Sequence, residues 1–376
     1  MSIEIVALAA MVAAWLVLYA VFRDKDLGRI SFLPFGIIVR IGVSREPLEG
    51  GKLGRAVSLY GYLSIILMFL STIAFYYLAF RTALARLSPG PGGGEAAGFI
   101  PLIPGVTIPW DNLVYVAFAL GIGVLLHEAA HAIVAVAEGI RLKDAGIAIF
   151  LFIPAAFVEL DEDQLNRARL TSRLKVFSAG VAANILVALA VLAAASALPL
   201  VEPTGVKIVG VEEGSPAAVA GLAQGMTILE VNGKPVRSLD DLRRLLGEAG
   251  VTDESARAEV YIKVRDADGA TRELVVVKEP GRTTIGVSVA EFYDSKLATT
   301  INALVLLNIG VGLINAAPIL LPLPGAAVLS DGGHIAVHVG EKLLGRNGRY
   351  LGAAIGIATL ILIIGLLSFQ PLDLTP

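Results

Sequence analysis

The chain has 376 residues, of which 56% are hydrophobic, and its mean hydropathy is +0.75. This composition lies far above that of a soluble domain and predicts a polytopic membrane protein. The net charge of only -3 indicates no nucleic-acid partner, and the lack of cysteine excludes disulfides, thiolate zinc sites and a cysteine nucleophile.

Six stretches are long and apolar enough to cross a membrane, since a spanning helix needs about 20 mostly apolar residues. Six in one chain disfavour the alternative of buried core helices in a soluble protein. No basic segment precedes the first stretch and no clear cleavage pattern follows it, so we expect an uncleaved span rather than a signal peptide. The six stretches are 3–22, 57–81, 112–138, 174–199, 297–321 and 350–369.

Two further apolar segments, 30–41 and 145–158, are too short or too broken by Gly and Pro to span. Their β-branched and aromatic residues predict strands. Non-helical backbone at membrane depth is tolerated only when it is buried in protein or lines a wet cavity. We expect these segments beside a functional site, as re-entrant hairpins, or equally as interfacial loops that rest on lipid headgroups.

The third span contains the motif His127-Glu128-Ala129-Ala130-His131. Ionisable groups are costly inside a membrane and usually mark function. Residues four apart share a helix face, so both imidazoles can bind one metal ion, with Glu128 close enough to act as a general base. Two packed histidines are the alternative, but two of only four histidines in the chain fall at this spacing around a glutamate.

Basic residues in the loops predict the orientation of the spans, because such residues concentrate on the cytoplasmic side. We expect three basic segments in the cytoplasm, and the N-terminus and the region after the fourth span outside. The third span then runs inward, which places His127 and His131 in its cytoplasmic half. The basic segments are 23–56, 139–173 and 322–349, whereas 83–111 contains only Arg86 and is expected outside.

A catalytic zinc site takes three protein ligands and leaves one position open, so a third ligand must come from elsewhere. Between residues 297 and 340 the one acidic residue is Asp331, after the proline-broken stretch 317–324. Broken helices bring side chains into cavities, which favours a ligand. An aspartate before Gly-Gly is equally typical of a solvated turn.

His334 and His338 are also four residues apart, with Glu341 in reach as a third ligand. No acid lies between them to act as a base, and nothing in the sequence keeps water away from them. We therefore expect them on a short interfacial helix after the Gly-Gly turn.

Asn184 lies early in the fourth span, after the small residues Ala179 and Gly180. Small residues allow close helix packing, and an asparagine is costly in lipid without a partner. Asn184 is either a hydrogen-bonding contact between helices or a donor to a developing oxyanion. Its expected depth, similar to that of His127, favours the catalytic role.

The segment 204–292 is less hydrophobic, and its charges and short apolar runs predict a small α+β domain between the fourth and fifth spans. A helix is expected from Leu239 to Glu248, with acidic residues in its first turn. Strands are expected at Val206–Val211, Thr227–Val231, Ala258–Val264 and Glu273–Val277.

Together these residues resemble the site-2 protease family of intramembrane zinc metalloproteases. Three elements match in the family's order: the zinc-binding helix at 127–131, the Ala-Gly…Asn helix with Asn184, and an Asn-Pro-Asp-Gly-Gly segment. The last is split here into Asn315-Ala-Ala-Pro318 and Asp331-Gly332-Gly333, with extra residues including Pro322, Pro324 and Gly325 between them. The resemblance implies Zn²⁺ ligated by His127, His131 and Asp331, Glu128 as base, Asn184 supporting the oxyanion and Asn315 contacting the substrate.

The segment 204–292 resembles a PDZ domain through Gly214-Ser-Pro-Ala-Ala-Val-Ala-Gly-Leu222 and Gly225-Met-Thr-Ile-Leu-Glu-Val-Asn-Gly-Lys-Pro235. An aspartate usual after the second glycine is Met226 here. PDZ domains bind peptides by strand addition and often bind a terminal carboxylate. The alternative is a spacer that limits access only sterically.

We therefore expect a polytopic α-helical membrane protein with about six transmembrane helices, short membrane-associated strands and an inserted α+β PDZ-like domain. The expected activity is that of a multi-pass zinc metalloendopeptidase of the cell membrane. It would cleave transmembrane segments of membrane proteins near the cytoplasmic face, with the PDZ-like domain outside the cytoplasm controlling access. The alternatives are an inactive membrane scaffold and a transporter. The expected divisions are 1–111 (N-terminal helices), 112–200 (first part of the catalytic membrane core), 204–292 (PDZ-like domain) and 297–376 (second part of the core and last helix).

Overall fold

The computed structural model describes residues 3–25, 27–46, 52–87, 98–198, 203–266, 269–293, 295–323 and 326–374. The chain divides into two compact units. We call Met1–Ala193 with Ala303–Asp373 the membrane unit, and Ala194–Asn302 with Leu374–Pro376 the insert unit.

Long apolar helices build the membrane unit, because in lipid a helix satisfies its own backbone hydrogen bonds. Among the described residues, five helices are long and apolar enough to cross a membrane. They correspond to five of the six expected spans. The first expected span forms α1, in which the apolar stretch Ala9–Phe22 is shorter. The long helices are α1 (Ile3–Phe22), α2 (Lys52–Leu87), α3 (Leu113–Ala137), α5 (Leu170–Ala197), α8 (Lys296–Ala316) and α10 (Arg346–Gly365); the short ones are η1 (Trp110–Asn112), α4 (Glu162–Arg167) and α9 (Asp331–Leu344).

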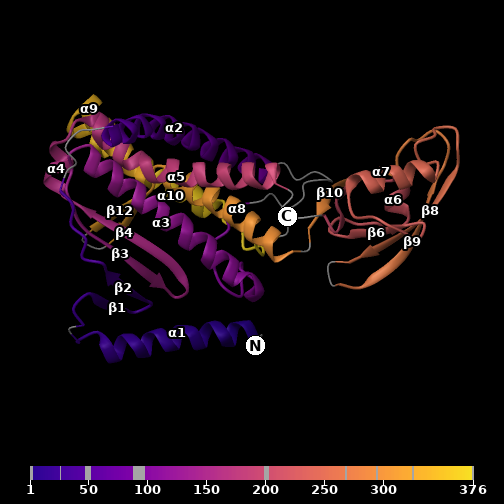
Figure 1. Cartoon of the computed structure of the whole chain (residues 1–376), viewed down its shortest axis with the longest axis horizontal. Coiled ribbons are helices and arrows are strands. Elements are labelled where there is room, and N and C mark those ends of the chain that lie inside the picture. Colours follow the sequence, from indigo (N-terminus) through magenta and orange to yellow (C-terminus); the bar gives the residue numbers. More distant parts are fainter. Residues whose placement is uncertain are drawn as a thin grey trace. The chain divides into compact units, whose positions relative to one another are not determined.

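The two broken apolar segments form hairpins, and the hairpins pair into one antiparallel sheet with the order β1-β2-β3-β4. The expectation of strands is confirmed, whereas the pairing between the two segments was not predicted. Strand β4 is at the edge of this sheet and packs along α3 (Figure 1). The strands are β1 (Ile30–Leu33), β2 (Gly36–Arg40), β3 (Leu142–Phe150) and β4 (Ile153–Leu160).

The extra residues between α8 and α9 form a hairpin of β11 (Leu320–Leu323) and β12 (Ala326–Leu329). Pro322 lies in β11, whereas Pro324 and Gly325 lie outside the described residues. Ser330 closes the hairpin. Its hydroxyl donates to the Ala317 carbonyl at 2.6 Å and accepts from the Ile319 amide at 2.9 Å. The hairpin therefore brings the chain back beside residues 317–319 before α9 begins.

Helix α9 begins at Asp331, so Gly332 and Gly333 lie within its first turn rather than in a turn before it. The expectation of a helix after the Gly-Gly turn is wrong in this respect. A Cβ atom at Gly332 would clash with the Ala316 carbonyl oxygen. Glycine is needed there because the first turn of α9 packs directly on the backbone at the end of α8, which overrides its low helix propensity.

The insert unit is an α+β structure with the sheet order β10-β5-β6-β8-β9 and β7 paired to β6. Its core is apolar, with Ile208, Ile228 and Ile262 fully buried. The four expected strands and the expected helix are present, whereas β7, β10 and α6 were not predicted. The elements are β5 (Gly205–Val211), α6 (Pro216–Val219), β6 (Thr227–Val231), β7 (Lys234–Pro235), α7 (Leu239–Glu248), β8 (Ala258–Arg265), β9 (Thr271–Lys278) and β10 (Val287–Phe292).

A buried ion pair fixes the end of α3 in the membrane unit. The ammonium of Lys175 on α5 lies 2.8 Å from Glu138 and 2.8 Å from the Ser58 hydroxyl. The other carboxylate oxygen of Glu138 accepts from Ser172 at 2.7 Å. Each charge is therefore compensated away from water.

We expect Lys175→Met to destabilise the protein by about 3–5 kcal/mol, because it leaves Glu138 buried without its cation. The double variant Lys175→Met/Glu138→Gln removes both charges and should recover at least half of the loss. Unfolding of the detergent-solubilised variants measures both effects. Equal stability of Lys175→Met and the wild type would show that this pair does not hold α3 and α5 together.

Candidate metal centre

The structure brings His127, His131 and Asp331 together, although Asp331 lies about 200 residues further along the chain. The Nε2 atoms of the two histidines are 3.1 Å apart. The Oδ2 atom of Asp331 lies 3.1 Å from His127 Nε2 and 3.3 Å from His131 Nε2. Both imidazoles are buried, and the Asp331 side chain is 13% exposed. Helices α3 and α9 thus present three metal-binding atoms to one point.

Hydrogen bonds on the far side of each ring define the tautomers of the two histidines. His131 Nδ1 lies 2.6 Å from the carbonyl oxygen of Val176, which can only accept. His127 Nδ1 lies 2.6 Å from Asn184 Oδ1. Both Nδ1 atoms therefore carry the proton, and both Nε2 atoms present a lone pair toward Asp331. Such partners orient metal-binding histidines in proteins.

The arrangement fits a tetrahedral zinc ion. Zinc bonds of about 2.0–2.1 Å place neighbouring ligand atoms about 3.3 Å apart in a tetrahedron. Asp331 Oδ2 is buried and has no hydrogen-bond donor, so the described site holds three electron-rich atoms with no proton between them. A cation removes this repulsion. Gly180 on α5 keeps the space open, since a Cβ atom there would clash with the Nε2 atoms of both histidines.

Glu128 is half-buried on α3, directly after the first histidine. Its carboxylate lies within hydrogen-bonding reach of the backbone N–H of Val158 on the edge strand β4. The carboxylate is therefore beside both the histidine pair and the unpaired edge of the sheet. This position suits a base that acts on a chain lying along β4.

Asn184 is fully buried and uses both hydrogens of its amide in bonds to other helices. Nδ2 donates to the Gly123 carbonyl on α3 and to Asn308 Oδ1 on α8, each at 3.0 Å. Asn308 in turn donates to the Leu304 carbonyl at 2.8 Å. These two acceptors fix Nδ2 on their side of the Asn184 amide. Oδ1 therefore faces His127 and accepts a hydrogen bond from its Nδ1.

Asn308 was not singled out from the sequence, although it is a fully buried amide in an apolar span. The signal that could have found it is the cost of an unpartnered amide in lipid, which also drew attention to Asn184.

Asn315 lies near the end of α8 and donates to the Val311 carbonyl of its own helix at 3.0 Å. It lines a mostly apolar cavity of about 440 Å³ between α3, α8 and residues 98–102. The Asn315 side chain therefore faces this cavity and forms its hydrogen bond within α8.

His334 and His338 do not converge on a metal with Glu341. Their rings stack on Phe177, with ring centres 4.5 Å and 5.6 Å away. Among the described residues, the group able to hold a metal is His127, His131 and Asp331.

We expect Asn184→Ala to weaken metal binding about 10- to 100-fold, because His127 loses the acceptor that orients its ring. Asn184→Asp keeps an acceptor and should lose less. Titration of the metal-free protein with zinc measures both affinities. Unchanged zinc affinity with a lower turnover rate would instead assign Asn184 to the oxyanion.

Long apolar helices, a buried cluster of two histidines and an aspartate, and an adjacent glutamate define a membrane-embedded metal site of the metallohydrolase class. The chain belongs to peptidase family M50, whose family model matches residues 115–363. The members of this family are membrane-embedded, zinc-dependent metalloproteases.

Two similar proteins illustrate the extent of the similarity. An uncharacterised protein of Methanocaldococcus jannaschii is 29% identical over 355 residues, which cover 92% of this chain and 88% of that protein. A probable periplasmic serine endoprotease, DegP-like, of Pseudomonas fulva is 31% identical over 115 residues, which cover 27% of this chain and 24% of that protein.

Proposed function

We propose that this protein is a zinc metalloendopeptidase that cleaves transmembrane segments of other membrane proteins. The observation that carries this proposal is the convergence of three lone-pair atoms, 3.1–3.3 Å apart, beside a glutamate and an edge strand. A transporter does not need this combination, and an inactive scaffold does not need an intact Glu128.

His127, His131 and Asp331 would hold the zinc ion. When bound, zinc supplies a Lewis acid that polarises the scissile carbonyl and lowers the pKa of water. Glu128 takes the proton from the attacking water and delivers it to the leaving amine. Asn184 and the Val176 carbonyl keep the two imidazoles oriented throughout, so we propose that Asn184 acts through His127.

The substrate would bind in an extended form along β4. A transmembrane helix hides its carbonyls, so it must unwind before cleavage. The free edge of β4 can replace the helical hydrogen bonds of the substrate by backbone pairing. The apolar cavity lined by Asn315 would accept a neighbouring part of the substrate, with the Asn315 side chain as a polar contact.

We place the active site toward the cytoplasm and the insert unit on the outer side. The basic segments around α4 and α9 support this orientation, since Lys and Arg concentrate in cytoplasmic loops. His127 and His131 lie in the second half of α3, which would run inward.

The insert unit would act as a PDZ-like domain that controls access. Strand β10 is at the edge of its sheet and packs beside α7. Such an edge strand beside a helix offers a site for strand addition by a peptide or a C-terminus.

The test is cleavage of a single-pass substrate by the full-length protein reconstituted in lipid. We expect cleavage within the transmembrane segment near its cytoplasmic end, loss of activity with a zinc chelator and recovery with zinc. Mass spectrometry of the products locates the bond. Cleavage only outside the apolar segment, or full activity after zinc removal, would overturn the proposal.

A further inference from the structure

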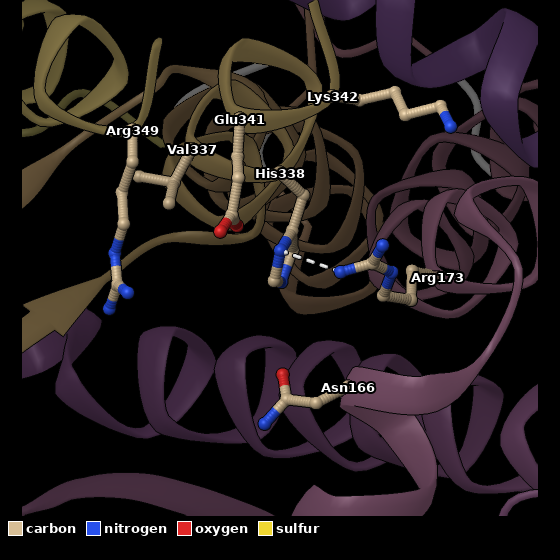
Figure 2. A pocket seen from close by; sticks show the side chains of 7 residues that line it. All are labelled: Asn166, Arg173, Val337, His338, Glu341, Lys342 and Arg349. Atoms are coloured by element: carbon tan, nitrogen blue, oxygen red, sulfur yellow. Dashed lines mark hydrogen bonds between the residues drawn. The ribbon is translucent and has the colours of Figure 1, made fainter. Parts of the chain in front are cut away.

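A second cavity, of about 500 Å³, lies in the membrane unit and shares no residue with the metal ligands. Helices α4, α5, α9 and α10 contribute its lining side chains, which are labelled in Figure 2. Asn166 comes from α4, Arg173 from α5 and Arg349 from α10. Helix α9 contributes the remaining lining residues, which are Val337, His338, Glu341 and Lys342.

The lining of this cavity carries an excess of positive charge. Arg173, Lys342 and Arg349 contribute three positive charges and Glu341 one negative charge, which leaves a net charge of +2. Within the described part of the chain, none of the three cations forms an ion pair with a carboxylate. Like charges around one cavity repel one another, and a bound anion would reduce this repulsion.

One hydrogen-bond donor of Arg173 is buried without an acceptor among the described residues. Its Nη1 donates to Nδ1 of His338 at 3.1 Å, the bond drawn in Figure 2. Its Nε atom is buried and has no partner among the described residues. Arginine remains protonated in proteins, so an acceptor from a ligand would complete its hydrogen bonding.

The His338 ring contributes no charge to the cavity. Burial and the neighbouring Arg173 guanidinium lower the pKa of His338 to about 4. The ring is therefore neutral at pH 7, and its Nδ1 accepts a hydrogen bond from Arg173. A neutral ring does not offset the positive charge of Arg173.

The cavity lies where two apolar spans begin. Arg173 is the fourth residue of α5, and Arg349 is the fourth residue of α10. Both helices are long and apolar enough to cross a membrane. Side chains at such helix ends reach the level of the lipid phosphates, where cations attract anionic headgroups.

We propose that this cavity binds a phosphate group, presented either by an anionic phospholipid headgroup or as free inorganic phosphate. Arginine forks match two phosphate oxygens, and lysine adds a point charge. The side-chain amide of Asn166 lies at the opposite wall and adds a polar group to the cavity (Figure 2). The Glu341 carboxylate in the same lining repels an anion and lowers its affinity.

The test compares thermal stability of the full chain in nanodiscs of phosphatidylcholine. One arm adds inorganic phosphate at constant ionic strength, and the other adds phosphatidic acid to the lipid. We expect a saturable rise of the Tm. A rise with free phosphate assigns a soluble ligand, and a rise with phosphatidic acid alone assigns a lipid headgroup. Neither readout depends on proteolysis.

Four variants make the result specific. Lys342→Gln and Arg349→Gln should each weaken the apparent affinity at least about tenfold, since each removes a charge-assisted contact. Glu341→Gln should strengthen it. Arg167→Gln, an exposed cation of α4 that does not line the cavity, should leave it unchanged. No rise in either arm, or an equal rise in all four variants, would overturn the proposal.

Discussion

Replacing Glu128 by glutamine is expected to lower the cleavage rate of a transmembrane substrate by about 100- to 10,000-fold, the usual contribution of a general base. Glutamine has nearly the same shape, so the contact with Val158 and the packing of α3 should remain. The three ligand atoms are untouched, and the zinc content should stay at about one ion per chain. Cleavage assays and metal analysis on the same preparation measure both quantities.

Glu162→Gln provides the matched control, because Glu162 is an exposed glutamate of α4 with no role in the site. It should leave the cleavage rate unchanged. Undiminished cleavage by Glu128→Gln would remove Glu128 from the mechanism.

Replacing Asp331 by alanine is expected to abolish both zinc binding and cleavage. The site then keeps only two histidines, whereas a catalytic zinc site takes three protein ligands. The result should therefore differ from that of Glu128→Gln, in which metal is retained and activity is lost. Zinc content after purification and the zinc affinity of the metal-free protein distinguish the two variants.

Asp111→Ala is the matched control for this change, because Asp111 is an exposed aspartate before α3. Its zinc content should equal that of the wild type. If Asp331→Ala retained zinc at wild-type affinity, the third ligand would have to be another residue.

Elements with strong local patterns could be predicted from the sequence. The helix from Leu239 to Glu248 has the expected bounds, because Ser238 caps its first turn and acidic residues follow. The pairing of β2 with β3 could not be predicted, because it joins residues such as Ile38 and Ala148 that are more than 100 positions apart. Partner choice in a sheet depends on tertiary packing rather than on local pattern.

The site shows the same contrast. The spacing of His127 and His131 on one helix indicates a metal pair without any tertiary information. The position of Asp331 depends on how the chain returns after α8, which its local sequence does not encode. Asn308 was missed because its importance comes from Asn184 on another helix.

The position of Asp331 does not depend on the number of residues in the β11–β12 hairpin. Ser330 follows the hairpin and is hydrogen-bonded to Ala317 and Ile319, which precede it. The chain between these points can therefore lengthen or shorten without moving α9. Residues inserted between the two strands would therefore leave the ligand in place. This makes the hairpin a suitable position for a fluorescent or affinity label, and a place where related chains can differ in length while keeping the same metal centre.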